Sequence, residues 1–229
     1  MEIFLFLAIY IVYLIFWGRL FLHGLLWFRA SGNYYWTTPG TVPLCSFSVC
    51  VPTLFDIIFF RRLWEDNKLL WFGSWTFHVS FLVVIIRHLR YFMDPVPDCV
   101  VFVQPFGVVA GYLLPLSVAY IVLIRTLGLR TKYVSYQNYF ILGLVFAISA
   151  LGLLMRNFFV PDLPEVKEFA LGILRFGPWK VPGSLLFFAH FLLVLVLVPY
   201  LPFHIFTAPY VMGEARRREA GLKMVMHDR

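Results

Sequence analysis

Histidine is the residue type in this sequence whose placement best suggests chemistry. Four of the six histidines lie in two long apolar segments, residues 69–93 and 181–206: His78, His88, His190 and His204. An ionisable side chain within hydrocarbon is costly and is normally kept for a function. A low-spin haem takes one imidazole nitrogen on each side of its iron. Two antiparallel helices that carry two histidines each are therefore predicted to bind two haems, with one haem as the minimum.

The spacing of these histidines predicts how they pair. His78 and His88 are ten residues apart, and His190 and His204 are fourteen apart. On a helix these separations correspond to about 15 Å and about 21 Å along the axis. Because the two segments run in opposite directions, His88 is matched in depth with His190 near one membrane face, and His78 with His204 near the other. The alternative is that the histidines only form hydrogen bonds between helices.

Charged residues surround His88. Arg87 and Arg90 flank it, and each could donate a charge-assisted hydrogen bond to a haem propionate or to a quinone carbonyl. The alternative is that these arginines extend towards the membrane interface, as long basic side chains do. Asp94 follows at the end of the same segment, and we predict that Arg87 and Asp94 contribute to a quinone pocket.

The composition indicates an integral membrane protein. Of 229 residues, 61% are hydrophobic, 20% aromatic and 14% charged. A helix needs about 20 apolar residues to cross a bilayer, where it satisfies its own backbone hydrogen bonds. We predict one all-α membrane domain, residues 1–229, with an interfacial helix at about 51–64. Its five spans are expected at about residues 3–22, 69–93, 103–124, 136–155 and 181–206.

The distribution of basic residues predicts the orientation of the bundle. Residues 23–68, 125–135 and the basic tail 210–229 hold most of the 19 Lys and Arg residues. By the positive-inside rule these segments are cytoplasmic, which places the N-terminus outside and the C-terminus inside. The basic tail either retains this topology or also docks an acidic partner or lipid headgroups. The longest outside loop, residues 156–180, is expected only to cap the bundle.

The motifs around the histidines resemble a known family. The H-x9-H pattern of His78 and His88, the later His190 and the pair Pro202-Phe203 are similar to the gamma subunits of respiratory nitrate reductases. That resemblance implies a five-helix cytochrome b that binds two haems and oxidises quinol. Within this family the chain most resembles DsrM of the dissimilatory sulphite-reduction membrane complex and the related subunit of the archaeal Hme complex. The stretches that carry this closer resemblance lie at residues 56–63, 77–78, 87–97 and 139–156.

The resemblance also implies haem ligands. His78, His88 and His190 fall on the ligand positions of the family. The nitrate reductase pattern places its last ligand at the position of Ala208, four residues beyond His204. His204 stands one helical turn earlier, where it could substitute.

The resemblance implies a function in electron transfer. Such subunits carry haem b and exchange electrons between menaquinol and a cytoplasmic iron–sulphur subunit similar to heterodisulphide reductase, in sulphur metabolism. Their complexes also contain a second quinone-interacting membrane subunit, a periplasmic multihaem cytochrome c and a ferredoxin-like protein. The expected location is the cytoplasmic membrane of a bacterium or archaeon, and no nucleic-acid partner is expected. The alternatives are a gamma-type subunit of a nitrate reductase-like complex, a transporter whose histidines relay protons, and an anchor subunit without a cofactor.

Overall fold

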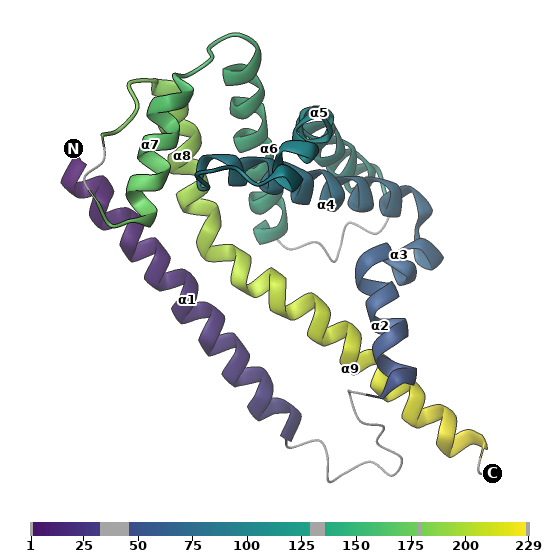
Figure 1. Cartoon of the computed structure of the whole chain (residues 1–229). Coiled ribbons are helices and arrows are strands. Elements are labelled where there is room, and N and C mark those ends of the chain that lie inside the picture. The colour runs from purple at the N-terminus through teal and green to yellow at the C-terminus, as the bar shows by residue number, and fades with distance from the viewer. Residues whose placement is uncertain (1, 33–45, 129–135, 178–179, 228–229) are drawn as a thin grey trace. The chain divides into compact units, whose positions relative to one another are not determined.

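The computed structural model describes residues 2–32, 46–128, 136–177 and 180–227, and within these ranges the chain forms helices and no strands (Figure 1). Five helical segments are long and apolar enough to cross a membrane, which confirms the prediction of an all-α protein with five candidate spans. They are Phe4–Trp27, Lys68–Tyr91, Asp98–Leu127, Tyr136–Asn157 and Leu185–Lys223.

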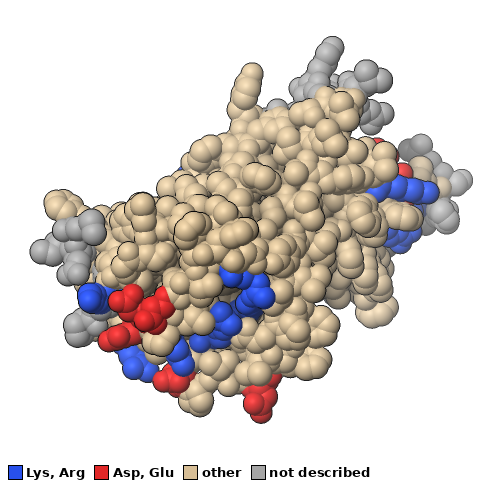
Figure 2. All heavy atoms as spheres, turned by 90° about the horizontal axis from the view of Figure 1, so that it is seen from above, with Lys and Arg blue, Asp and Glu red and all other residues tan. Residues whose placement is uncertain are grey.

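The surface of the protein is largely apolar. In Figure 2, residues other than Lys, Arg, Asp and Glu cover most of the face in view, and the charged side chains gather in a few patches. Large apolar side chains such as Phe4, Phe102 and Leu116 are exposed on the candidate spans. A surface of this kind suits contact with lipid rather than with water.

The helices fall into two units. The first contains residues 1–6 and 67–197, and the second contains residues 7–66 and 198–229. Helix α1 (Glu2–Gly32) begins in the first unit and continues in the second. The first unit otherwise holds α4 (Lys68–His88), η1 (Leu89–Tyr91), α5 (Asp98–Leu127), α6 (Tyr136–Asn157), α7 (Leu163–Leu174) and α8 (Leu185–Leu197). The second holds α2 (Phe47–Phe59), α3 (Arg61–Asp66), η3 (Val198–Tyr200) and α9 (Leu201–His227).

In the first unit, α4 and α5 pack closely against each other. Gly73 on α4 faces the ring of Tyr120 on α5, where an added Cβ would lie 2.6 Å from Tyr120 Cδ1. The side chains that α5 buries repeat at intervals of three and four residues, as one face of a helix requires. They are Ala110, Leu114, Val118 and Ile121.

Helix α7 lies in the connection between α6 and α8, where the sequence analysis expected only a cap. Asp162 caps its N-terminus, because the Asp162 side chain accepts a hydrogen bond from the Glu165 backbone N–H at 3.5 Å. Phe169 is 2% exposed and its ring makes edge contacts with the rings of Phe187 and Phe191 on α8. Burial of this aromatic ring attaches α7 to the bundle, since a fully buried Phe contributes about 1.5–3 kcal/mol.

In the second unit, the predicted interfacial helix is divided in two. Helix α2 ends at Phe59, and α3 begins at Arg61. Phe60 between them has φ 49°, a left-handed conformation that ends a helix.

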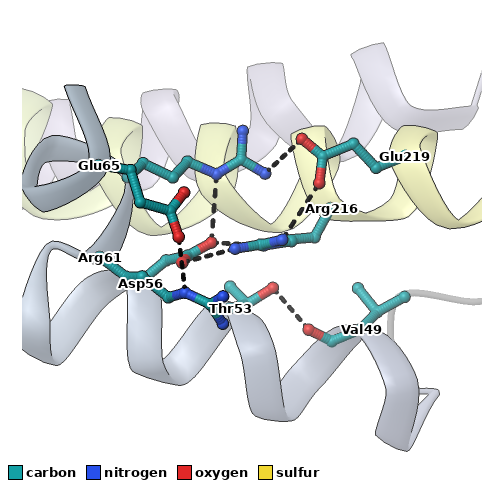
Figure 3. A network of polar contacts seen from close by, with 8 residues as sticks. Val49, Thr53, Asp56, Arg61, Glu65, Arg216 and Glu219 are labelled. Carbon is teal, nitrogen blue, oxygen red and sulfur yellow. Dashed lines mark hydrogen bonds and ion pairs between the residues drawn. The ribbon is translucent and has the colours of Figure 1, made fainter.

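A buried carboxylate joins α2 to α9 (Figure 3). Asp56 is 0% exposed, and its Oδ1 accepts a hydrogen bond from Arg216 Nη2 at 2.8 Å. Its Oδ2 accepts from Arg216 Nε and, at 3.2 Å, from Arg62 Nε. Glu219 pairs with both guanidinium groups, at 2.9 Å from Arg62 Nη2 and 3.2 Å from Arg216 Nη1. Burial would raise the pKa of Asp56, but the hydrogen bonds and charges of Arg216 and Arg62 lower that pKa below its ordinary value.

The basic tail is largely neutralised within the chain. Besides the Arg216 pairs, Arg217 Nη2 lies 2.8 Å from Glu214 Oε1 and Arg218 Nε lies 3.3 Å from the same oxygen. The three consecutive arginines of the tail therefore each have an acidic partner in the second unit. This arrangement favours a structural role for these arginines over a free basic surface.

We expect Asp56→Asn to destabilise the packing of α2 on α9. Removing one partner of a buried ion pair leaves the other charge uncompensated, at a cost of about 3–5 kcal/mol. Glu65→Gln is the control, because Glu65 and its partner Arg61 are both more than half exposed, and exposed pairs contribute about 0–1 kcal/mol. Chemical denaturation in detergent micelles measures both free energies of unfolding. Equal effects of the two substitutions would contradict the role of Asp56.

Candidate functional site

His88 and His190 are oriented in the same way, each through a backbone carbonyl. His88 is the last residue of α4, and its Nδ1 lies 2.7 Å from the carbonyl oxygen of Val84. His190 is on α8, and its Nδ1 lies 2.9 Å from the carbonyl oxygen of Ile148 on α6. A carbonyl oxygen can only accept, so Nδ1 donates in both cases. In the neutral imidazole Nε2 then carries the lone pair, which is the state needed to bind a metal.

The first unit contains both imidazoles. In this unit α5 packs against α4 and α6, and α6 packs against α8, which carries His190. The residue of α6 opposite the His190 ring is Gly152, where an added Cβ would lie 3.6 Å from His190 Cε1. Helix α6 therefore supplies the hydrogen-bond acceptor of His190 and lies beside its ring.

The two other histidines predicted to bind haem, His78 and His204, lie in different units. His78 is on α4, ten residues before His88, and its Nδ1 lies 2.7 Å from the Ser74 carbonyl oxygen. His78 thus has the same orientation through its own helix as His88. His204 belongs to α9 and to the second unit.

Three arginines surround the His88 end of α4. Arg87 Nε and Arg90 Nη1 both donate to Gln104 Oε1 on α5, at 3.4 and 3.0 Å. The side chain of Arg87 crosses α5 at Gly107, where any Cβ would collide with it. Arg156 lies in the last turn of α6, which packs against α5. Within the described parts of the chain none of the three arginines forms an ion pair with a carboxylate.

The predicted quinone residues, Arg87 and Asp94, do not meet each other. Asp94 forms an ion pair with Lys167 on α7, with Lys167 Nζ 2.9 Å from Asp94 Oδ1. This contact lowers the pKa of Asp94 below its ordinary value, so the carboxylate is ionised at neutral pH. The sequence analysis did not single out Lys167, Gln104 or Arg156, since each is an ordinary polar residue beside an apolar run.

The donor set at this site suits a cofactor that brings most of its own ligands. Across the described residues, no group of three or more His, Cys, Asp or Glu side chains forms a site for a metal ion. Haem iron needs two protein nitrogens at most, because the porphyrin supplies the other four. The pair His88 and His190 fits that requirement, and the unpaired arginines near His88 suit an anionic group such as a propionate.

Together, the fold and the site define a helical, multi-pass membrane protein in which backbone carbonyl oxygens orient two imidazoles of the first unit. Comparison of the sequence with known proteins finds two archaeal relatives, each described as an Hdr-like menaquinol oxidoreductase cytochrome b-like subunit. The protein of Archaeoglobus profundus is 32% identical over 197 residues, covering 73% of this chain and 59% of the relative. The protein of Archaeoglobus fulgidus is 31% identical over 178 residues, covering 66% of this chain and 54% of the relative. The chain therefore spans less than two thirds of the length of either relative.

Other comparisons add no further relative. No protein-family model matches the chain. No solved structure matches it either.

We expect Gly152→Leu to disturb the site and Gly143→Leu on the same helix to be tolerated. The Cβ of a leucine at position 152 would already touch the His190 ring, so the branches beyond it would crowd this contact, and overpacking costs about 1–3 kcal/mol. Gly143 is a matched control, because an added Cβ there would meet nothing within 4 Å. The free energies of unfolding in detergent micelles measure the difference. A Gly143→Leu variant as unstable as Gly152→Leu would contradict the contact with His190.

Proposed function

We propose that this chain is a haem b-carrying membrane subunit that exchanges electrons between menaquinol and a cytoplasmic iron–sulphur subunit. The observation that carries the proposal is the matched orientation of two imidazoles of the first unit, His88 on α4 and His190 on α8. The names of the two archaeal relatives, cytochrome b-like subunits of menaquinol oxidoreductases, support the same cofactor and substrate.

In this proposal His88 and His190 hold one haem through their Nε2 atoms. The carbonyl oxygens of Val84 and Ile148 keep each Nδ1 protonated, so that Nε2 points its lone pair away from the backbone. A haem bound in this way supplies reversible one-electron oxidation and reduction. A second haem, held by His78 and His204, stays a prediction of the sequence.

The arginines near His88 have a role in the same proposal. A guanidinium that lacks a carboxylate partner in an apolar protein is costly unless a ligand provides the negative charge. Arg87 and Arg156 would bind the propionates of the haem through charge-assisted hydrogen bonds. Their positive charges would also favour the reduced, more negative form of the cofactor.

Menaquinol would lose two electrons and two protons at the His88 end of the bundle and become menaquinone. The excess of Lys and Arg in residues 23–68 and 210–229 favours placing these segments in the cytoplasm, beside an iron–sulphur subunit similar to heterodisulphide reductase. The location proposed is the cytoplasmic membrane, with the subunit as part of a larger respiratory complex. Additional membrane, multihaem and ferredoxin-like subunits belong to this proposal by resemblance.

We expect a reduced-minus-oxidised visible spectrum of the purified protein to show b-type haem bands. His88→Ala and His190→Ala should each remove the same bands, because the two side chains bind the same iron. His23→Ala is the control, since His23 packs on the ring of Phe203 in the second unit and should leave the bands unchanged.

Two results would contradict the proposal. Protein without b-type bands would favour the transporter or anchor alternatives. Unequal losses of haem in the His88 and His190 variants would show that these residues do not share one haem.

A further inference from the structure

A pocket of about 500 Å³ lies in the first unit where η1, the start of α5 and the start of α7 meet. Its volume is in the range of about 300–1,000 Å³ that holds small organic ligands. Its apolar lining comes from Val96, Val101, Leu163 and Pro164. Helix α7 therefore supplies one wall of this open pocket.

Arg90 lines the pocket, and neighbouring side chains hold its guanidinium. Arg90 donates to Gln104 Oε1 at 3.0 Å and to the Tyr91 hydroxyl, and its guanidinium carbon lies 4.6 Å from the centre of the Tyr91 ring. Three contacts hold the group in place, so little side-chain entropy is lost when it donates to a ligand. Lys167 also lines the pocket, but its charge is balanced by Asp94.

The chemistry of the lining indicates the class of ligand. Apolar walls and one unbalanced cation suit a flat, uncharged ring with an oxygen that accepts a hydrogen bond. Two unbalanced positive charges would favour a dianionic ligand, but the Asp94 carboxylate balances the charge of Lys167. A quinone ring, whose carbonyl oxygens only accept, meets these conditions.

The pocket is also adjacent to the proposed haem site. Tyr91 belongs to the 3-10 turn that directly follows His88, and the centres of the two rings are 6.0 Å apart. A ligand in the pocket would therefore lie one side chain away from an imidazole of the site. Such a short separation favours electron exchange between the ligand and a haem at His88.

We propose that this pocket binds the naphthoquinone ring of menaquinone, the product of menaquinol oxidation, and that Arg90 donates a hydrogen bond to one carbonyl oxygen of the ring. Gln104 and Tyr91 are positioning residues that hold the guanidinium, and α7 closes one side of the ring site. This assignment rests on the proposed function and replaces the pair Arg87 and Asp94 expected from the sequence. Asp94 contributes through Lys167, whose charge it balances.

Binding of menadione, a naphthoquinone without a lipid tail, to the purified full chain tests this assignment. Titration calorimetry should show a dissociation constant raised about tenfold or more in Arg90→Gln, because a hydrogen bond from a charged donor is lost. Leu163→Trp should weaken binding by filling the pocket without changing its charge. Arg125→Gln, near the other end of α5, is the matched control and should bind menadione like the unaltered chain.

The haem spectrum of each variant separates this assignment from the proposed function. Weakened menadione binding in Arg90→Gln and Leu163→Trp with unchanged haem bands supports the pocket. Unchanged menadione binding in both variants overturns the pocket, and intact haem bands then leave the proposed function standing. Release of bound menadione by phosphatidylglycerol, with no effect of either substitution on menadione affinity, would also overturn the pocket and identify a lipid site. Absence of haem bands in every protein, including the unaltered chain, would instead contradict the proposed function.

Discussion

Hydrogen bonds from imidazole Nδ1 atoms to backbone carbonyl oxygens orient histidines of this protein. Because a carbonyl cannot donate, each bond determines which ring nitrogen carries the proton and which carries the lone pair. His88 obtains its acceptor from its own helix, whereas His190 uses Ile148 on the neighbouring α6. The rotation of α6 relative to α8 therefore determines the orientation of His190, and Gly152 leaves the room that its ring needs.

Charged side chains near Asp56 and near His88 are stabilised in two different ways. In the second unit, Asp56 is fully buried and shared by Arg216 and Arg62, so its charge is balanced by neighbouring residues. In the first unit, Arg87 and Arg90 both donate to the neutral amide of Gln104, and Arg90 also donates to the Tyr91 hydroxyl. The balanced network is explained by packing alone. In the proposed function, a haem propionate supplies the negative charge that no carboxylate in the described part of the first unit supplies to Arg87.

The sequence predicted the features that depend on composition and on the length of its apolar segments. Long apolar runs were enough to predict an all-α fold with five candidate spans, and histidines within those runs drew attention to the site. The sequence could not predict the hydrogen bond that orients His190. Its acceptor is a backbone carbonyl oxygen 42 residues away on another helix, and a backbone atom leaves no pattern in the residue types. Helix α7 was missed because its twelve residues are too few for a span, although Asp162 and Pro164 form a recognisable helix start. The turn at Phe60 was missed because a bulky residue rarely adopts a positive φ.

The low-temperature electron paramagnetic resonance spectrum of the oxidised protein tests the central claim most directly, because it reports the axial ligands of haem iron. The account predicts a low-spin ferric signal typical of two imidazole ligands, and its loss when the carbonyl-oriented ring of His190 is replaced by alanine. A high-spin signal in the unaltered protein, or a low-spin signal that survives replacement of His190 undiminished, would contradict the account.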